Sequence, residues 1–337
     1  MAFPLADWIL SHPGMPHDLA ESGMKGQLRS AQPILRKLRP GRPAELRAHL
    51  GAVLGIAKDR IVLTTGATTA NTLVLLYLRD RLRARSGRSL TAGLVRPEYP
   101  PLWDAAKGLG LRVSEGLSGK DLAILSNPNN PEGYLRTEEE LLRATEGSKA
   151  VLVDETFREF TLARSLARRG RANLWTTGTF TKVYGTDDIR IGFAVAPPEE
   201  ASSFADEADL WVDRPSLASV GVAQDLLRAR ETVVGESRRL YLRNLEVLRE
   251  RVDPEFVSRA PVWFDRGIAP GTSLKLAQTG LRKGVLVCPG HYFRDPSGVR
   301  VCLTQRSFPE DLEAYLSLRR RFESSSSRGR GATRSSV

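Results

Sequence analysis

One lysine, Lys182, stands among residues that could hold a phosphate-bearing cofactor beside it. Residues 179–192 read TFTKVYGTDDIRIG, with hydroxyls at Thr179 and Thr181 and a guanidinium at Arg190. A lysine amine forms a Schiff base with a carbonyl cofactor, and arginine offers a planar fork for phosphate that threonine hydroxyls can complete. The segment therefore suggests covalent attachment of such a cofactor, but a strand–turn–strand with a solvated lysine would look the same, so other segments must decide.

A glycine turn joins an apolar strand to a long helix near residue 66. Gly66, Ala67 and Thr68 follow the run IVLTT and open an apolar-periodic segment that reaches Leu82. Free backbone N–H groups at a helix N-terminus bind phosphate. The turn therefore predicts a second phosphate contact, and a plain strand–helix turn is the alternative.

Three polar side chains come directly after other predicted strands. Tyr99 follows the strand in LTAGLVRPEYP, Asn130 lies in the loop NPNNPEG after DLAILS, and Asp154 ends the apolar run AVLV. Ligand sites of α/β sheets collect at the carboxyl ends of strands. We therefore expect these side chains to meet Lys182. The alternatives are a core aromatic for Tyr99, a turn former for Asn130 and an ion pair with Arg158 for Asp154.

The order of apolar segments indicates an α/β fold with a smaller companion. Strand-like and helical patterns alternate over residues 61–195, which favours a mostly parallel sheet with helices on both faces. Helical patterns then continue to about residue 251, and the strand-like pieces PVWFD, SLKLAQ, GVLVCPG and VRVCLT follow. We predict a large cofactor-binding domain at 38–235 and a smaller α+β domain at 1–37 plus 236–322.

The two ends of the chain lack such patterns. Residues 1–37 are rich in Gly and Pro, which predicts an extended arm rather than a helix. Residues 323–337 contain Ser, Gly and Arg without apolar anchors, which predicts a disordered tail.

Composition places the chain among globular proteins. Of 337 residues, 41% are hydrophobic and 26% charged, enough for a large core. No apolar run could span a bilayer and no signal peptide is recognisable, so we expect a cytoplasmic protein. Cys288 and Cys302 form neither a metal-ligand spacing nor a disulfide framework, and we expect no metal.

The net charge of +11 raises the question of nucleic acid. No zinc finger, helix-turn-helix or RNA-binding aromatic signature accompanies it, and the basic residues are mixed with acidic ones. A solvated basic surface is the preferred interpretation, with a field that attracts anionic substrates as an alternative.

Five motifs together resemble the fold-type I, class I/II aminotransferases that depend on pyridoxal 5′-phosphate. PEYP resembles their PTYP, NPNNPEG their NPxNPTG, VDETF their DEAY, TFTKVYGTDDIRIG their SxSKxxGxxGxRxG, and GVRVCL their late arginine strand. The resemblance covers about residues 15–320 and includes the histidinol-phosphate aminotransferases and threonine-phosphate decarboxylases. It implies a mostly parallel, seven-stranded sheet between helices, a pyridoxal 5′-phosphate cofactor and a homodimer.

The resemblance also implies roles for the catalytic and ring-binding residues. Lys182 would hold the cofactor as an internal aldimine and then move a proton, while Asp154 would keep the pyridine nitrogen protonated. Tyr99 would stack on the ring and Asn130 would hydrogen-bond its 3-oxygen.

The remaining roles concern the phosphate and the substrate. Arg300 would clamp the substrate carboxylate, with Asn130 and Gly23 as further substrate contacts. The residues expected around the phosphate are Gly66, Ala67, Thr68, Thr179, Thr181 and Arg190.

Three departures from the family pattern bear on these roles. Phe157 replaces a tyrosine that donates to the 3-oxygen, so we expect a higher pKa for the cofactor–lysine linkage. Asp188 replaces the second glycine of GxxGxR. The tyrosine that reaches the partner's phosphate has no match in residues 38–42, where Arg39 and Arg42 are the candidates for its role.

We therefore predict an aminotransferase that moves an amino group between small amino-acid and 2-oxo-acid substrates. Decarboxylation of an amino acid or its phosphate, or lyase chemistry on the same fold, is the alternative. A non-catalytic nucleic-acid-binding protein is a remote one, against which the retention of both Lys182 and Asp154 argues.

Overall fold

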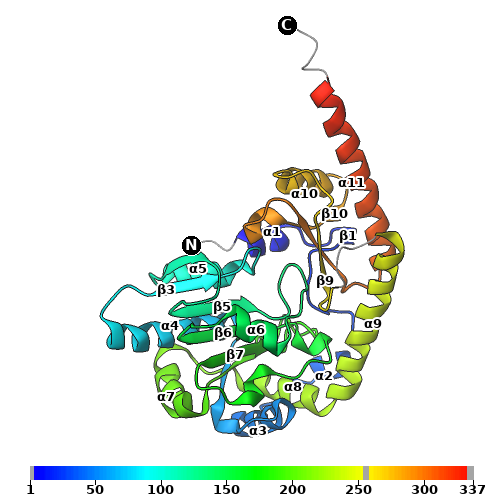
Figure 1. The fold of residues 1–337 in the computed structure, drawn as a ribbon. Helices are drawn as coiled ribbons and strands as arrows, with labels where there is room; N and C mark the ends of the chain where they lie inside the picture. Colours follow the sequence, from blue (N-terminus) through cyan, green and yellow to red (C-terminus); the bar gives the residue numbers. More distant parts are fainter. Residues whose placement is uncertain (1–3, 253–257, 332–337) are drawn as a thin grey trace.

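A seven-stranded sheet forms the centre of the computed structural model, which describes residues 4–252 and 258–331 (Figure 1). Its strand order is β2-β8-β7-β6-β5-β3-β4, and β8 alone runs opposite to the other six strands. The strands are β2 (Ile61–Thr64), β3 (Thr91–Leu94), β4 (Arg112–Glu115), β5 (Leu122–Ser126), β6 (Ala150–Asp154), β7 (Leu174–Thr179) and β8 (Gly192–Val195). The predicted mostly parallel α/β sheet is confirmed.

Both faces of this sheet are covered, as its sequence pattern requires. In β5, Leu122 and Ile124 join one apolar cluster, whereas Ala123 and Leu125 join another on the opposite face. Successive strand residues point to opposite faces, so a strand apolar at every position must be buried on both. The helices that follow the strands are α4 (Ala67–Ser86), α5 (Pro100–Gly108), α6 (Glu138–Ala144) and α7 (Ala201–Trp211).

Smaller sheets and long helices make up the rest of the described chain. An antiparallel sheet has the order β11-β12-β9, and β1 pairs with β10 in parallel. Figure 1 shows α9 running from the level of the large sheet towards these smaller ones. Their bounds are β1 (His17–Asp18), β9 (Val262–Asp265), β10 (Val285–Leu286), β11 (Cys288–Pro289) and β12 (Val299–Cys302), with helices α3 (Pro43–Leu54), α8 (Leu217–Arg228), α9 (Arg230–Arg251), α10 (Ser273–Leu281) and α11 (Phe308–Gly331).

Two secondary-structure predictions are wrong. Residues 1–37 contain the helices α1 (Pro4–Leu10) and α2 (Gln32–Leu35), because proline is tolerated in the first turn of a helix. The run SLKLAQ lies in α10 rather than in a strand. Its buried residues Ser273, Leu276 and Ala277 have the helical spacing that a short apolar run does not distinguish from alternation.

The predicted disordered tail is also partly wrong. Residues 323–331 continue α11, because an established helix gains one hydrogen bond for each residue it adds. Residues 332–337 lie outside the described part. The predicted domain boundary at 235/236 falls inside the continuous helix α9 and remains a prediction. Within the described residues, no helix is long and apolar enough to cross a membrane.

Candidate active site

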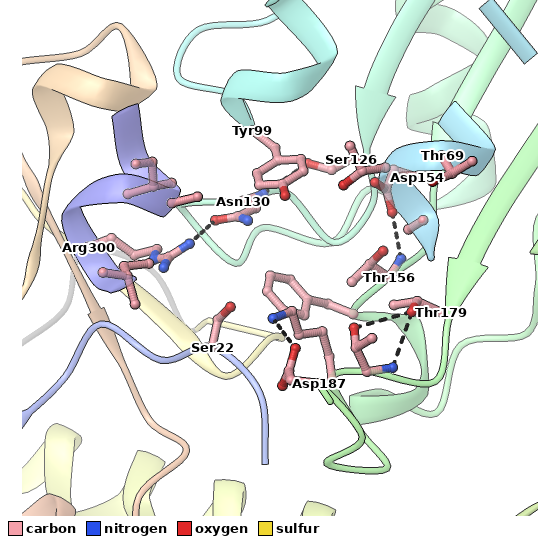
Figure 2. A pocket seen from close by; sticks show the side chains of 18 of the residues that line it. Ser22, Thr69, Tyr99, Ser126, Asn130, Asp154, Thr156, Thr179, Asp187 and Arg300 are labelled. Atoms are coloured by element: carbon pink, nitrogen blue, oxygen red, sulfur yellow. Dashed lines mark hydrogen bonds and ion pairs between the residues drawn. The ribbon is translucent and has the colours of Figure 1, made fainter. Parts of the chain in front are cut away.

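A cavity of about 490 Å³ gathers most of the predicted site at the carboxyl ends of the central strands (Figure 2). Arg300 and Asp154 lie at opposite ends of it, and Tyr99 faces Asp187 across it. Of the predicted residues, the lining contains Ala67, Thr68, Tyr99, Asn130, Asp154, Thr179, Thr181, Lys182, Arg190 and Arg300.

Asp154 ends β6 with both carboxylate oxygens held by the chain. Oδ2 accepts a 2.7 Å hydrogen bond from Nδ2 of Asn71, and Oδ1 accepts one of 2.9 Å from the Thr156 backbone N–H. Asn71 in turn accepts from the Thr177 hydroxyl at 2.5 Å. Burial raises the pKa of Asp154, and the bonds from Thr156 and Asn71 oppose that rise. The network fixes the carboxylate at the end of the cavity where a cationic ring nitrogen would complete its charge balance.

Tyr99 is fixed by a buried acid, Glu98, next to it in the chain. The Tyr99 backbone N–H donates to Glu98 at 2.6 Å, and both the backbone N–H and the hydroxyl of Ser126 donate to the same carboxyl group. Burial raises the pKa of Glu98 to about 8. This contact ties the turn that carries Tyr99 to the end of β5, and Tyr99 also hydrogen-bonds Thr68.

Lys182 faces two carboxylates. Its Nζ lies 3.2 Å from Oδ1 of Asp187 and 3.6 Å from Oε1 of Glu21. Burial lowers the pKa of Lys182, but Glu21 and Asp187 more than reverse this, so the pKa is raised. Oδ2 of Asp187 is buried and has no hydrogen-bond partner among the described residues.

The start of α4 lies against Arg190 and β8. Gly66 precedes the helix with φ 136°, a conformation that glycine adopts readily. A Cβ there would come 2.8 Å from Nη2 of Arg190, and a Cβ on Gly192 would come 2.5 Å from the Gly66 carbonyl carbon. Two glycines therefore allow the helix N-terminus and an exposed guanidinium to meet at one end of the cavity, as phosphate binding requires.

The two threonines before Lys182 stabilise its turn. The Thr179 hydroxyl donates to the Ile191 carbonyl oxygen at 2.9 Å, and it accepts from the Thr181 backbone N–H at 3.1 Å. Both residues line the cavity, but the Thr179 proton is already used within the chain.

Arg300 on β12 is buried, with 2% of its surface exposed. Nη1 donates to Oδ1 of Asn130 at 3.0 Å and Nη2 donates to the Ala20 carbonyl oxygen at 2.9 Å. Nε is buried without a hydrogen-bond partner among the described residues. Arg300 lines the cavity, and a buried guanidinium that has an unpaired donor suits a carboxylate.

Two predicted residues, Gly23 and Gly66, are not in the cavity lining. Ser22 lines it in place of Gly23, and a Cβ on Gly23 would lie 2.4 Å from Oδ2 of Asp187. Gly23 therefore leaves room for Asp187 rather than contacting the cavity itself, while Gly66 shapes the turn behind it.

The three departures from the family pattern have different surroundings. Phe157 is buried and lines the cavity. Asp188 is exposed and forms a 2.8 Å ion pair with Lys25. Arg39 pairs with Asp225 and Arg42 pairs with Glu45, so within this chain both arginines are bound outside the cavity lining.

Several residues of the site escaped the sequence analysis. Asn71 had a usable signal, because it lies one helical turn after Ala67 and faces the same way. No sequence pattern marks the other acids as site residues, apart from their positions next to recognised motifs; they are Glu21, Glu98 and Asp187. The apolar residues of α1 that line the cavity were hidden by the surrounding prolines and glycines; they are Leu5, Ala6, Ile9 and Leu10.

The cavity suits a phosphorylated pyridine aldehyde. It has a buried acid for a ring nitrogen, an amine for an aldehyde, and a helix N-terminus with a guanidinium for a phosphate. The buried, unpartnered Nε of Arg300 leaves a donor for the carboxylate of a substrate.

Comparison with known proteins agrees with this geometry. The profile of the family described as aminotransferase class I and II matches residues 112–314. An aspartate aminotransferase from Thermococcus kodakarensis is 27% identical, over 80% of this chain and 76% of its own. An aromatic amino acid aminotransferase from Mycobacteroides abscessus is 26% identical, over 82% of each chain. A solved PLP-dependent aminotransferase from Streptococcus suis shares the fold, with a TM-score of 0.77, 21% identity and coverage of 96% of this chain and 98% of its own.

The chain therefore belongs to the class I and II aminotransferases and has the type I fold of pyridoxal-phosphate enzymes. It is a pyridoxal-phosphate-dependent aminotransferase whose substrates are small amino acids and oxo acids. Family membership does not favour the decarboxylase or lyase alternative.

Proposed function

We propose that Lys182, Asp154 and Arg300 are the residues that carry out amino-group transfer in this cavity. The supporting observation is that these three side chains, from three separate segments, line one cavity. Pyridoxal phosphate supplies an aldehyde that accepts the amino group and a ring that withdraws electrons. Asp154 would hold a proton at the ring nitrogen, and Lys182 would hold the aldehyde carbon and carry a proton to or from the substrate's α-carbon.

The other predicted residues position the two ligands. Tyr99 would hold the ring face and Asn130 would hold the ring oxygen, while Asn130 also accepts a hydrogen bond from Arg300. Arg300 binds the α-carboxylate of the substrate. We assign the phosphate to Arg190, the hydroxyls of Thr68 and Thr181, and the N-terminal N–H groups of α4, with Thr179 supporting the turn.

The substrate's side chain meets an apolar wall. Helix α1 contributes Leu5, Ala6 and Ile9 to the cavity lining, and Figure 2 shows this N-terminal helix beside Arg300. Apolar surface is buried favourably against apolar side chains. We therefore propose an amino donor with an apolar side chain.

An absorbance spectrum with pyridoxal phosphate tests this proposal. The purified protein should show a visible band that Lys182→Ala abolishes, and apolar amino acids should bleach that band to the pyridoxamine form. A band that persists in Lys182→Ala would refute the role of this lysine. Conversion by acidic or basic donors alone would refute the apolar specificity, while leaving the lysine assignment standing.

We also propose a cytoplasmic homodimer. Large apolar side chains remain exposed near the start of α8: Leu38 (63%), Leu210 (81%), Trp211 (56%) and Leu217 (53%). The Gly41 N–H donates to the Leu217 carbonyl oxygen at 2.7 Å, which ties the segment with Leu38 to α8. Exposed apolar patches mark protein interfaces. Light scattering should give twice the chain mass, and Trp211→Glu should reduce it towards the monomer; a monomeric wild type would contradict the proposal.

A further inference from the structure

A second cavity, of about 610 Å³, lies beside the loops that follow β5 and β6. It shares no lining residue with the cofactor cavity. Its wall contains the carboxylates Glu138 and Glu155. Its six arginines are Arg136, Arg158, Arg164, Arg168, Arg169 and Arg259.

The charges in this arginine cavity do not balance. Arg158 pairs with Glu155 at 3.2 Å, and Arg169 pairs with Glu138 at 2.8 Å. None of the other four arginines has a carboxylate within ion-pair distance in the described part of the chain. Six cations against two anions leave four positive charges gathered in one concavity, and such a concavity concentrates anions.

Arg136 is held in place with a donor free. Its N–H donates to Oδ1 of Asn127 at 2.9 Å, and Nδ2 of Asn127 donates to its carbonyl oxygen at 3.1 Å. Its guanidinium lies 5.2 Å from the centre of the Tyr134 ring. Nη1 is nevertheless buried with no hydrogen-bond partner among the described residues. A buried donor without an acceptor is costly, and Arg136 is one of the residues that line this cavity, where an anion would supply acceptors.

We propose that the arginine cavity binds a small polyanion carrying at least one phosphate group, at a site separate from the cofactor. Guanidinium forks match the paired oxygens of phosphate, and several of them around one cavity favour a ligand with more than one negative charge. The volume falls in the range of small-molecule pockets, about 300–1,000 Å³.

The two cavities are kept apart by the loop after β6. Thr156 and Phe157 line the cofactor cavity, whereas Glu155 and Arg158 line the arginine cavity. Glu155 is fixed on its side by the Leu166 N–H, which donates to it at 2.8 Å. An anion bound beside Arg158 therefore has no access to the cofactor, and both ligands can be present together.

Calorimetric titration of the pyridoxal-phosphate-loaded enzyme with inorganic pyrophosphate tests the proposal. The loaded enzyme is used because the cofactor already occupies the phosphate site near Arg190. We expect saturable binding that weakens at higher salt and leaves the visible band unchanged. Arg136→Ala combined with Arg164→Ala should weaken it by about tenfold or more.

The matched control removes the same charge elsewhere. Arg83 and Arg85 are exposed near the end of α4, outside the arginine cavity. The double variant Arg83→Ala, Arg85→Ala should bind pyrophosphate like the wild type. A retained visible band in all variants shows that each is folded and loaded.

Four results would overturn the proposal. These are an absence of binding, equal weakening by the control pair, loss of the cofactor band on addition of pyrophosphate, and a preference for duplex DNA over pyrophosphate that depends on Arg136 and Arg164. The last would indicate a nucleic-acid surface instead. None of these results bears on Lys182, whose role rests on the separate spectral test.

Discussion

The two ends of the cofactor cavity are prepared to different degrees. At the Asp154 end, the carboxylate, Asn71 and Thr177 satisfy one another through hydrogen bonds inside the chain. At the Lys182 end, Asp187 has a buried oxygen without a partner among the described residues, and Arg190 is exposed. The Asp154 end is preorganised, whereas at the Lys182 end one oxygen of Asp187 lacks a hydrogen-bond partner among the described residues and the Arg190 guanidinium is open to a ligand.

This difference predicts how substitutions will act. Changes at the preorganised end should affect the reaction more than cofactor affinity, because the network defines charge at the reacting ring. Changes at the Lys182 end should affect how and how tightly the cofactor attaches. The predictions below run from the largest expected effect to the smallest.

Asp154→Asn should have the largest effect. The amide cannot balance a protonated ring nitrogen, so the amino-donor half-reaction should slow by on the order of a hundredfold to a thousandfold. The visible band should still form, because Lys182 is intact. Single-turnover absorbance measures both the half-reaction rate and the visible band. An unaltered rate would show that Asp154 is not a catalytic residue.

Arg190→Ala should weaken cofactor binding by roughly ten- to a hundredfold, the effect of one charge-assisted hydrogen bond pair. The bleaching rate at saturating cofactor should change far less. Equilibrium titration of the apoprotein gives the dissociation constant. A large fall in rate with unchanged affinity would reverse the proposed contrast between the two ends.

Asn71→Ala removes a partner that supports Asp154 without reaching the substrate. We expect the half-reaction to slow by about tenfold, because Asp154 loses a hydrogen bond and the Thr177 hydroxyl loses its acceptor. Thr177→Val is the matched variant, with a smaller loss expected. If Asn71→Ala changed only the melting temperature, Asn71 would be structural.

Asp187→Asn should shift the pH dependence of cofactor attachment to Lys182 towards lower pH. Glu21 and Asp187 raise the pKa of Lys182, so near neutral pH they hold it as ammonium, which cannot attack an aldehyde. Removing one carboxylate lowers that pKa, and the rise in attachment rate with pH should begin about one pH unit lower. Stopped-flow absorbance across pH measures this.

Asp188→Asn is the control for that profile. It removes the same charge one residue further on, where Asp188 is exposed and paired with Lys25. Its profile should match the wild type. Equal shifts in the two variants would mean that general surface charge, rather than contact with Lys182, sets the profile.

The central sheet and the residues at its strand ends were predictable because local patterns determine them. Strands apolar at every position require a covered sheet, and the chain then places Asp154 and Lys182 at the same edge. Glycine turns and the lysine motif carry their chemistry within a few residues, so the sequence displays it directly.

The remaining features depend on contacts between distant segments. Glu21 meets Lys182 across 161 positions of sequence, and no local pattern indicates that approach. Helix α1 is short and surrounded by proline and glycine, and the Nε1–H of its Trp8 donates a hydrogen bond to the Val287 carbonyl oxygen. Tertiary packing therefore decides its structure, and propensity alone does not.

The late position of Arg300 in the sequence also sets an order of events during synthesis. The contacts around Asp154 and Lys182 come from residues 61–195 and, through Glu21 and Met24, from the N-terminal segment, whereas Arg300 emerges from the ribosome about a hundred residues later. At usual elongation rates that delay is roughly 5–20 s. The residues of the Asp154 and Lys182 network are therefore synthesised before Arg300, the residue proposed to bind the substrate carboxylate.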